Sequence, residues 1–422
     1  MQSEMPRVAD ASTRRTYVTL ALLVLVSFFN YMDRMILPAV AQPIKLEFGL
    51  SDTELGLLNG LVFVLLYGIS GLPLSRWADR TSRTRVLAAA LAFWSLATAA
   101  CGMARTFSQL VVARMCVGIG ESASQPVGFS IVGELFPVQR RARAMGWFLM
   151  GNNLGITAGF ALGGWLAARY GWRSAFLAVA LPGVVVAAAL ALVRNPRVVV
   201  ADGGAKRPLS LFADVRGLLR NRRYCWLLVL SGTYGFTIFG PVSWLTAFFI
   251  RSHQLPLSAA AAAAGLVIGL GMTCGTLFGG AAADRLALGG GHRPQWLGLG
   301  SILLSGLAFA TTFTVANVSL AFAAAFFATL FGSVASPAIT TAIQNESPPA
   351  LRATAASLAT ITVSILGIAL APFLVGVLSD QLTPAYGKES LRIALLISLG
   401  GCLFAAALHY RVATLFKTDN AV

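Results

Sequence analysis

The stretch ARMCVGIGESAS, residues 113–124, places an arginine and a glutamate seven residues apart among apolar and small residues. Seven residues are about two helical turns, so Arg114, Glu121 and Gln125 share one face of a helix, together with Gly118. If this segment crosses a bilayer, each charge costs at least about 2.5 kcal/mol unless it faces a bundle interior or a water-filled cavity. We therefore expect this face to line such a cavity.

The composition indicates a polytopic membrane protein. Hydrophobic residues make up 57% of the 422 residues and charged residues only 11%, whereas soluble domains carry roughly 25% charged residues. Apolar segments of about 20 residues recur along the chain, each long enough to cross a hydrocarbon core roughly 30 Å thick. We predict an all-α fold with twelve transmembrane helices. The predicted spans are 17–40, 53–75, 86–104, 108–134, 144–168, 174–193, 224–250, 258–283, 295–315, 317–343, 354–378 and 391–410.

The distribution of the net charge of +16 predicts the orientation of the chain. With the N-terminus inside, the cytoplasmic loops carry 23 basic residues and the opposite loops carry 7. By the positive-inside rule, both termini are cytoplasmic. We expect a multi-pass protein of the plasma (inner) membrane whose basic loops contact anionic lipid headgroups. Binding to nucleic acid is not expected.

Two similar loops divide the chain into halves. The sequence SRWADRTSRTR, residues 75–85, has four arginines and Asp79, and GAAADR, residues 280–285, repeats its core 205 residues later at Asp284. A repeat at half the chain length predicts two pseudo-symmetric six-helix halves. The expected order is a tail at 1–16, a bundle at 17–193, a basic cytoplasmic linker at 194–223, a bundle at 224–413 and a tail at 414–422. The candidate gating and loop-motif residues are Arg34, Ser75, Asp79, Arg80, Arg83, Glu134, Arg140, Arg141, Gly280, Asp284 and Arg285.

Asp33 and Arg34 are the only charges within the first predicted span. Adjacent helical residues point about 100° apart, so the two cannot face the same neighbour. Asp33 lies about 12 Å below the outer end of the span near Pro43, in the same layer as Arg114. Asp33 can therefore meet Arg114 across the bundle, for proton coupling or as a structural ion pair. In the alternative interpretation, both charges mark the end of the helix and snorkel to the interface.

With its twelve spans, its paired Asp-Arg loops and the segment from Arg114 to Glu121, R-x-x-x-G-x-G-E, the chain resembles the major facilitator superfamily. That segment and NYMDR, residues 30–34, occur in two branches, the Spinster-like lipid transporters and the organic-anion/proton symporters. VGIGESAS, GELFPVQRRARAM and GWRSAFLAVALPG resemble the Spinster branch more. The family pattern has glycine where the first loop has Ser75 and the second has Gly280, so looser packing is expected at the first loop. The resemblance implies a transporter that works by alternating access.

Helix five carries four glycines at four-residue spacing, Gly151, Gly155, Gly159 and Gly163. Such a stripe lets another helix approach closely, either as tight packing or as a surface on which the halves rock. Asn152 and Asn153 are candidate cavity donors, although hydrogen bonds between helices explain them equally well. The candidate substrate-binding residues are Asn30, Tyr31, Arg114, Gln125, Asn152, Asn153, Tyr234, Thr237 and Ser333.

Predicted spans seven to eleven contain no charged residue, only hydroxyl groups amid Ala, Gly, Phe and Leu. This suits an amphiphile with a charged head and an apolar tail, and it equally suits a half that simply packs. His253, His292 and His409 lie in or beside predicted loops, and the five cysteines have no paired spacing. With no P-loop, metal-ligand cluster or G-x-S-x-G motif, no enzyme activity, cofactor or metal is expected.

The mechanism we predict uses Asp33 and Glu121 as proton carriers. Burial favours the protonated carboxyl and a nearby arginine favours the ionised one, so rocking of the halves changes proton affinity. Arg114 would alternate between these carboxylates and an anionic group of the substrate. The resemblance implies a monomeric, proton-coupled transporter of lysolipids or sphingoid phosphates. The alternatives are a proton symporter of small organic anions such as sugar acids, and a receptor on the same fold without transport activity.

Overall fold

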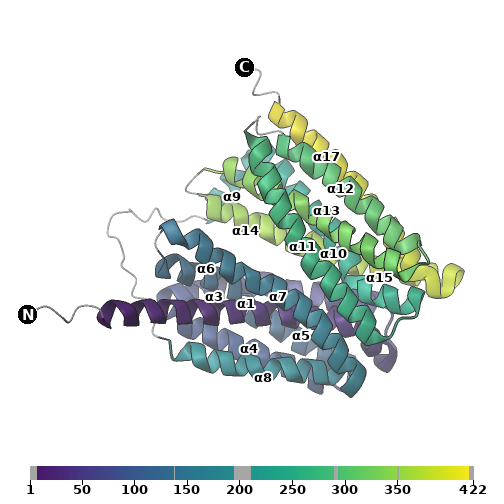
Figure 1. Cartoon of the computed structure of the whole chain (residues 1–422), viewed down its shortest axis with the longest axis horizontal. Coiled ribbons are helices and arrows are strands. Elements are labelled where there is room, and N and C mark those ends of the chain that lie inside the picture. The colour runs from purple at the N-terminus through teal and green to yellow at the C-terminus, as the bar shows by residue number, and fades with distance from the viewer. Residues whose placement is uncertain (1–6, 137, 194–210, 289–292, 349–350, 418–422) are drawn as a thin grey trace, which may run out of the picture. The chain divides into compact units, whose positions relative to one another are not determined.

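Helices form nearly all of the part of the chain that the structure describes, which agrees with the predicted all-α class (Figure 1). The structure is a computed structural model and describes residues 7–136, 138–193, 211–288, 293–348 and 351–417. The helices form two compact units, Met1–Val40 with Leu65–Ala201 and Ala41–Val64 with Asp202–Val422. Most of the predicted linker, 194–210, lies outside the described residues.

Each unit is a helical bundle whose members vary widely in length. Unit 1 contains most of α1 (Arg7–Phe48) and α3 (Leu61–Arg80), with α4 (Arg83–Met103), α5 (Phe107–Glu121), α6 (Ser124–Leu135), α7 (Val138–Tyr170) and α8 (Trp172–Ala191). Unit 2 contains α2 (Asp52–Asn59), α9 (Leu211–Arg220), α10 (Arg222–His253), α11 (Leu257–Ala287), α12 (Arg293–Thr314), α13 (Val318–Asn345), α14 (Arg352–Val363), η2 (Ser364–Leu370), α15 (Ala371–Tyr386), η3 (Gly387–Glu389), α16 (Ser390–Ser398) and α17 (Gly400–Lys417).

Each of the twelve predicted spans falls in helical segments, but the spans 53–75, 108–134, 354–378 and 391–410 are each divided between two or more helices. Within the described ranges, nine helices are long and apolar enough to cross a bilayer. One of them, Thr354–Lys417, contains the last two predicted spans. The chain turns within it at Gly387, where φ is 53°. The spans predicted at 108–134 and 144–168 fall in α5, α6 and α7. Those helices are not among the nine that are long and apolar enough. Helices α5 and α6 are too short, with 15 and 12 residues, and α7 is more polar than the nine.

The span predicted as one helix at 108–134 is interrupted at residues 122–123, between α5 and α6. Pro126 explains the interruption, because it has no N–H to donate to the carbonyl of Ser122 and its ring crowds that carbonyl. Arg114 and Glu121 remain on one helix, and Gln125 belongs to the next. The prediction that all three share one continuous helix was therefore wrong. A similar kink occurs in α1 at Val40, where φ is −109° and ψ is 15°, three residues before Pro43.

The glycine stripe of α7 faces α1. A Cβ added at Gly155 would overlap the carbonyl oxygen of Phe28, and one added at Gly159 would lie 2.6 Å from the carbonyl oxygen of Met32. Gly151 and Gly163 likewise face α1 residues. Because both helices belong to unit 1, this contact supports the interpretation of the stripe as tight packing within one bundle.

Substituting Gly155 should therefore destabilise the protein. We expect Gly155→Ala to cost about 1–3 kcal/mol, because the added methyl group meets backbone that cannot rotate away. Gly146→Ala, in the same helix, is the matched control, since nothing lies within 4 Å of its added Cβ. Thermal unfolding in detergent should show a lower midpoint for Gly155→Ala only. Equal midpoints for Gly155→Ala and the unmodified protein would contradict the packing argument.

In unit 2, a network of charges attaches α2 to α15 and α10. Arg251 donates two hydrogen bonds to the carboxylate of Asp52, at 2.7 and 2.8 Å, and Lys45 and Ser379 also bind that carboxylate. Asp380 accepts hydrogen bonds from the first N–H groups of α2, those of Asp52 and Thr53, at 2.9 and 2.7 Å. A carboxylate at a helix N-terminus satisfies unpaired donors and complements the helix dipole. These contacts explain why residues 41–64, assigned by sequence to the first bundle, cluster with unit 2.

Candidate functional site

Four charged side chains of α1 and α5 are buried inside unit 1. The exposed fractions of Asp33, Arg34, Arg114 and Glu121 are 2%, 9%, 3% and 0%. Two acids and two bases balance in formal charge, which lowers the cost of placing them at membrane depth. The predicted charged layer is thus present within a single unit.

An ion pair in this layer joins Arg34 to Glu121. The Nε atom of Arg34 donates to Oε2 of Glu121 at 2.6 Å. The guanidinium group also lies 4.7 Å from the ring centre of Tyr67 on α3 and 5.1 Å from that of Tyr31. Both distances suit cation–π attraction. Glu121 is therefore engaged by Arg34, which the sequence grouped with the gating residues, and Tyr67 was not identified from the sequence.

Asp33 faces a different neighbour, as the helical phase predicts. Its Oδ2 atom accepts a hydrogen bond from the Thr98 hydroxyl of α4 at 3.2 Å. Arg114 reaches the same turn of α1 and donates to the main-chain oxygens of Asp33 and Arg34, both at 3.4 Å. The alternative in which Asp33 snorkels to the interface is therefore wrong. Thr98 was not identified from the sequence, although a polar residue within an apolar span could have indicated it.

Several polar atoms of this layer are buried without a hydrogen-bond partner among the described residues. They are Oδ1 of Asp33, Oε1 of Glu121, and both the oxygen and the nitrogen of the Asn30 amide. Leaving a buried polar atom unpaired costs about 1–3 kcal/mol. Such atoms are therefore suited to receive a proton, a water molecule or a polar group of a ligand. We call one group of four residues the α1–α5 charge cluster: Asn30, Asp33, Arg34 and Glu121.

The amide of Asn152 connects three helices. Its Oδ1 atom accepts hydrogen bonds from the Ser27 hydroxyl of α1 and from Gln125 of α6, the latter at 3.5 Å. Hydrogen bonding between helices, one of the two explanations left open by the sequence, therefore accounts for Asn152. The side chain of Asn153 is partly exposed and remains a predicted cavity donor.

Two of the three candidates in the second half donate hydrogen bonds within their own helices. Thr237 donates to the backbone oxygen of Tyr234 at 2.8 Å, and Ser333 donates to that of Thr329 at 2.9 Å. Both hydroxyls are buried in unit 2, and Tyr234 is partly buried. Binding roles for these three residues remain predictions.

The predicted loop residues differ in what they contact. Glu134 forms an ion pair with Arg83, and its role in gating stays a prediction. Ser75 donates to the backbone oxygen of Gly71 at 2.7 Å. A Cβ at Gly280 would meet nothing within 4 Å. The exposed residues are Arg80, Arg140, Arg141, Asp284 and Arg285. The side chain of Asp79 lies outside the described part of the structure.

The prediction that His409 lies in or beside a loop was wrong. It is inside α17 with an exposed fraction of 0%, and its Nδ1 atom is 3.2 Å from Oε1 of Gln295 on α12. The predicted span ended at residue 410, so the sequence placed His409 at the membrane edge, whereas α17 continues to Lys417. No group of three or more His, Cys, Asp or Glu side chains in the described ranges is arranged to hold a metal ion.

Comparison with known proteins gives consistent matches. The family model of the Major Facilitator Superfamily matches residues 23–372. An MFS-type efflux pump of Mycolicibacterium smegmatis is 32% identical, over 95% of this chain and 93% of its own length. A sphingosine-1-phosphate transporter of Danio rerio is 28% identical over 93% of this chain and 84% of its own length.

Two further matches are a second transporter and a solved structure. A probable L-galactonate transporter of Escherichia coli is 29% identical over 64% of this chain and 62% of its own length. Among solved structures, a bacterial homologue of the human lysosomal transporter Spinster, in an inward-facing and unoccupied conformation, aligns with a TM-score of 0.88. It is 26% identical, and the alignment covers 96% of this chain and 98% of that one.

Proposed function

This chain belongs to the major facilitator superfamily, and from that premise we propose that it moves an anionic amphiphile across the membrane in exchange or symport with protons. Membership makes it a multi-pass membrane transporter of small molecules, in a family whose members are generally not enzymes, with Spinster-like relatives. The finer proposal covers proton coupling, an amphiphilic substrate such as a lysolipid or sphingoid phosphate, and alternating access. It also covers a monomer in the plasma (inner) membrane with both termini in the cytoplasm.

The observation that carries the proposal is the buried pair of Arg34 and Glu121. A proton and the guanidinium group of Arg34 compete for the same carboxylate. When Glu121 takes up a proton, Arg34 loses its counter-charge and attracts an anionic group of the substrate. When that group leaves, Arg34 again favours the ionised form of Glu121. Binding of the substrate and binding of the proton are thereby linked through the side chain of Arg34.

Asp33 and Arg114 complete the proposed mechanism. Asp33 is a second buried carboxyl, and one of its oxygens has no hydrogen-bond partner among the residues that the structure describes, so it can hold a proton in the same layer. Arg114 binds the backbone of the turn that carries both Asp33 and Arg34. We assign Arg114 the role of holding this turn in place and balancing the charge of the two buried carboxyl groups. In this assignment Arg34 replaces Arg114 as the main ligand of the anionic substrate group.

An amphiphile fits the surroundings of Arg34 better than a purely polar ligand does. The guanidinium group lies beside the rings of Tyr31 and Tyr67, which offer apolar surface next to a positive charge. The relative that transports sphingosine-1-phosphate handles a substrate of that type. The unpaired amide of Asn30 favours a second candidate, a sugar acid with several hydroxyl groups, as does the relative described as a probable L-galactonate transporter.

Flux measurements in proteoliposomes test the substrate class. Vesicles with the reconstituted protein and a pH gradient are supplied with either a labelled lysophospholipid or labelled L-galactonate, with protein-free vesicles as control. We expect protein-dependent, gradient-sensitive movement of the lysophospholipid only. Accumulation of L-galactonate alone would replace the amphiphile proposal with the sugar-acid symporter. Saturable binding of either compound without flux would contradict transport altogether.

A further inference from the structure

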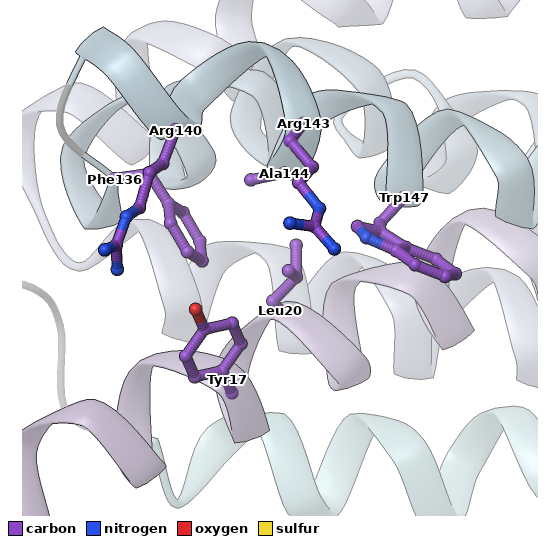
Figure 2. A pocket seen from close by; sticks show the side chains of 7 residues that line it. All are labelled: Tyr17, Leu20, Phe136, Arg140, Arg143, Ala144 and Trp147. Carbon is purple, nitrogen blue, oxygen red and sulfur yellow. The ribbon is translucent and has the colours of Figure 1, made fainter. Parts of the chain in front are cut away.

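A pocket of about 290 Å³ lies in unit 1, away from the α1–α5 charge cluster. Figure 2 shows its lining: two residues come from α1, one from the end of α6 and four from α7. The lining residues are Tyr17, Leu20, Phe136, Arg140, Arg143, Ala144 and Trp147. Neither the transport mechanism nor the comparisons assign this pocket a ligand.

The pocket exists because the close contact of α1 and α7 ends there. At Gly151 the α7 backbone lies against the carbonyl oxygen of Val24. About one helical turn nearer the start of α7, the glycines are replaced by Trp147, opposite Leu20. At this level Trp147 of α7 and Leu20 of α1 line the pocket.

The charge in this pocket is uniformly positive. Arg140 and Arg143 are three residues apart on α7, so they share one face of the helix. Both are exposed, and neither forms an ion pair or hydrogen bond with another residue in the part of the chain that the structure describes. Glu134, the acidic residue of α6, is instead paired with Arg83. The two guanidinium groups are therefore available to an external anion, and in Figure 2 both point toward the side on which Tyr17 lies.

The aromatic lining indicates that the pocket opens at the membrane surface. Tyr17 and Trp147 are 51% and 47% exposed, and amphipathic aromatic side chains of this kind concentrate at the level of lipid headgroups. Leu20 and Ala144 are buried and form an apolar wall. The site thus combines two cations with an apolar surface, next to basic loops that the positive-inside rule places in the cytoplasm.

We propose that this pocket binds the phosphate headgroup of an anionic membrane phospholipid. The guanidinium group of arginine matches phosphate oxygens in geometry and charge, and the tyrosine, tryptophan and leucine side chains would cover the glycerol and the first part of an acyl chain. The volume lies near the lower limit for small-molecule pockets, about 300 Å³. It therefore suits a headgroup rather than a whole amphiphile. A soluble phosphate ester shares the charge and lacks the apolar anchor.

Quenching of Trp147 fluorescence by brominated lipids tests the proposal. The protein is reconstituted in a series of phosphatidylcholine bilayers in which the fraction of either dibrominated phosphatidylglycerol or dibrominated phosphatidylcholine is raised stepwise. Subtracting the signal of Trp147→Phe isolates the contribution of Trp147 from the other tryptophans. We expect the anionic brominated lipid to quench Trp147 at a concentration about tenfold lower than the zwitterionic one, from the attraction of two arginines.

Two variants of equal charge separate the pocket from general surface electrostatics. Arg140→Gln with Arg143→Gln should remove the tenfold preference, whereas Arg141→Gln with Arg85→Gln, which changes two exposed arginines outside the lining, should keep it. Equal quenching by both lipids in the unmodified protein would overturn the proposal without any variant. An equal loss of the preference for the anionic lipid in both double variants would also overturn the proposal. Displacement of the lipid by millimolar glycerol 3-phosphate would assign the pocket to soluble phosphate esters instead.

Discussion

Arg34→Met should lower the free energy of unfolding by about 3–5 kcal/mol, the usual cost of removing one partner of a buried ion pair. Glu121 is fully buried and loses the guanidinium group 2.6 Å from its carboxylate. Uptake of a proton relieves the unpaired charge, so the deficit should shrink as the pH falls. The midpoint of thermal or denaturant unfolding in detergent, recorded at several pH values, measures the effect.

The double variant Arg34→Met with Glu121→Leu is the control for this prediction. It removes both charges and replaces them with apolar side chains, which is often neutral or stabilising for a buried pair. We expect it to recover at least half of the lost stability while transport stays absent. If Arg34→Met and the double variant unfold at the same midpoint, the loss arises from packing around Arg34 and not from its pairing with Glu121.

Glu121→Gln should abolish accumulation of substrate driven by a pH gradient. With one proton per substrate, a gradient of one pH unit supplies about 1.4 kcal/mol, which is a tenfold concentration ratio. The amide cannot exchange a proton, so the ratio should fall to one. Exchange of labelled for unlabelled substrate across the membrane needs no net proton movement and should persist. Asp33→Asn should also lose coupling, because the second buried carboxyl of the layer is neutralised.

The matched control is Glu389→Gln. Glu389 is a partly exposed carboxylate of unit 2 that pairs with Arg392, and its loss should leave the accumulation ratio unchanged. A tenfold ratio in both Glu121→Gln and Asp33→Asn would refute the proposed coupling. Loss of both accumulation and exchange would mean that Glu121 is needed for binding rather than for coupling.

The sequence was sufficient for the architecture because the bilayer imposes simple rules. Spans of about 20 apolar residues and the repeat between Asp79 and Asp284 follow from composition and spacing alone. The comparisons and the helices of the structure confirm the fold class. Sequence also placed Arg114 and Asp33 in one layer, since depth follows from the helical rise of 1.5 Å per residue. The interruption after Glu121 was missed although Pro126 signals it.

The sequence could not predict which side chains the buried charged residues of α1 and α5 contact. The angle of about 100° between adjacent helical residues predicts that Asp33 and Arg34 point in different directions. It does not predict which helix each side chain contacts. That depends on how α3, α4 and α5 are placed around α1, which is a property of packing. The same limit explains why Tyr67 and the network at Asp52 were not identified. The glycine stripe was ambiguous for the same reason, because spacing cannot show which helix faces it.

The most direct test of the coupling through Glu121 is proton movement driven by substrate alone. Proteoliposomes containing a trapped pH-sensitive dye receive a substrate gradient at equal pH on both sides, using the compound that the flux screen identifies. The proposed mechanism predicts a change of internal pH that is proportional to substrate flux in the unmodified protein and is absent in Glu121→Gln. Substrate flux without any pH change in the unmodified protein, or an equal pH change in Glu121→Gln, would contradict it.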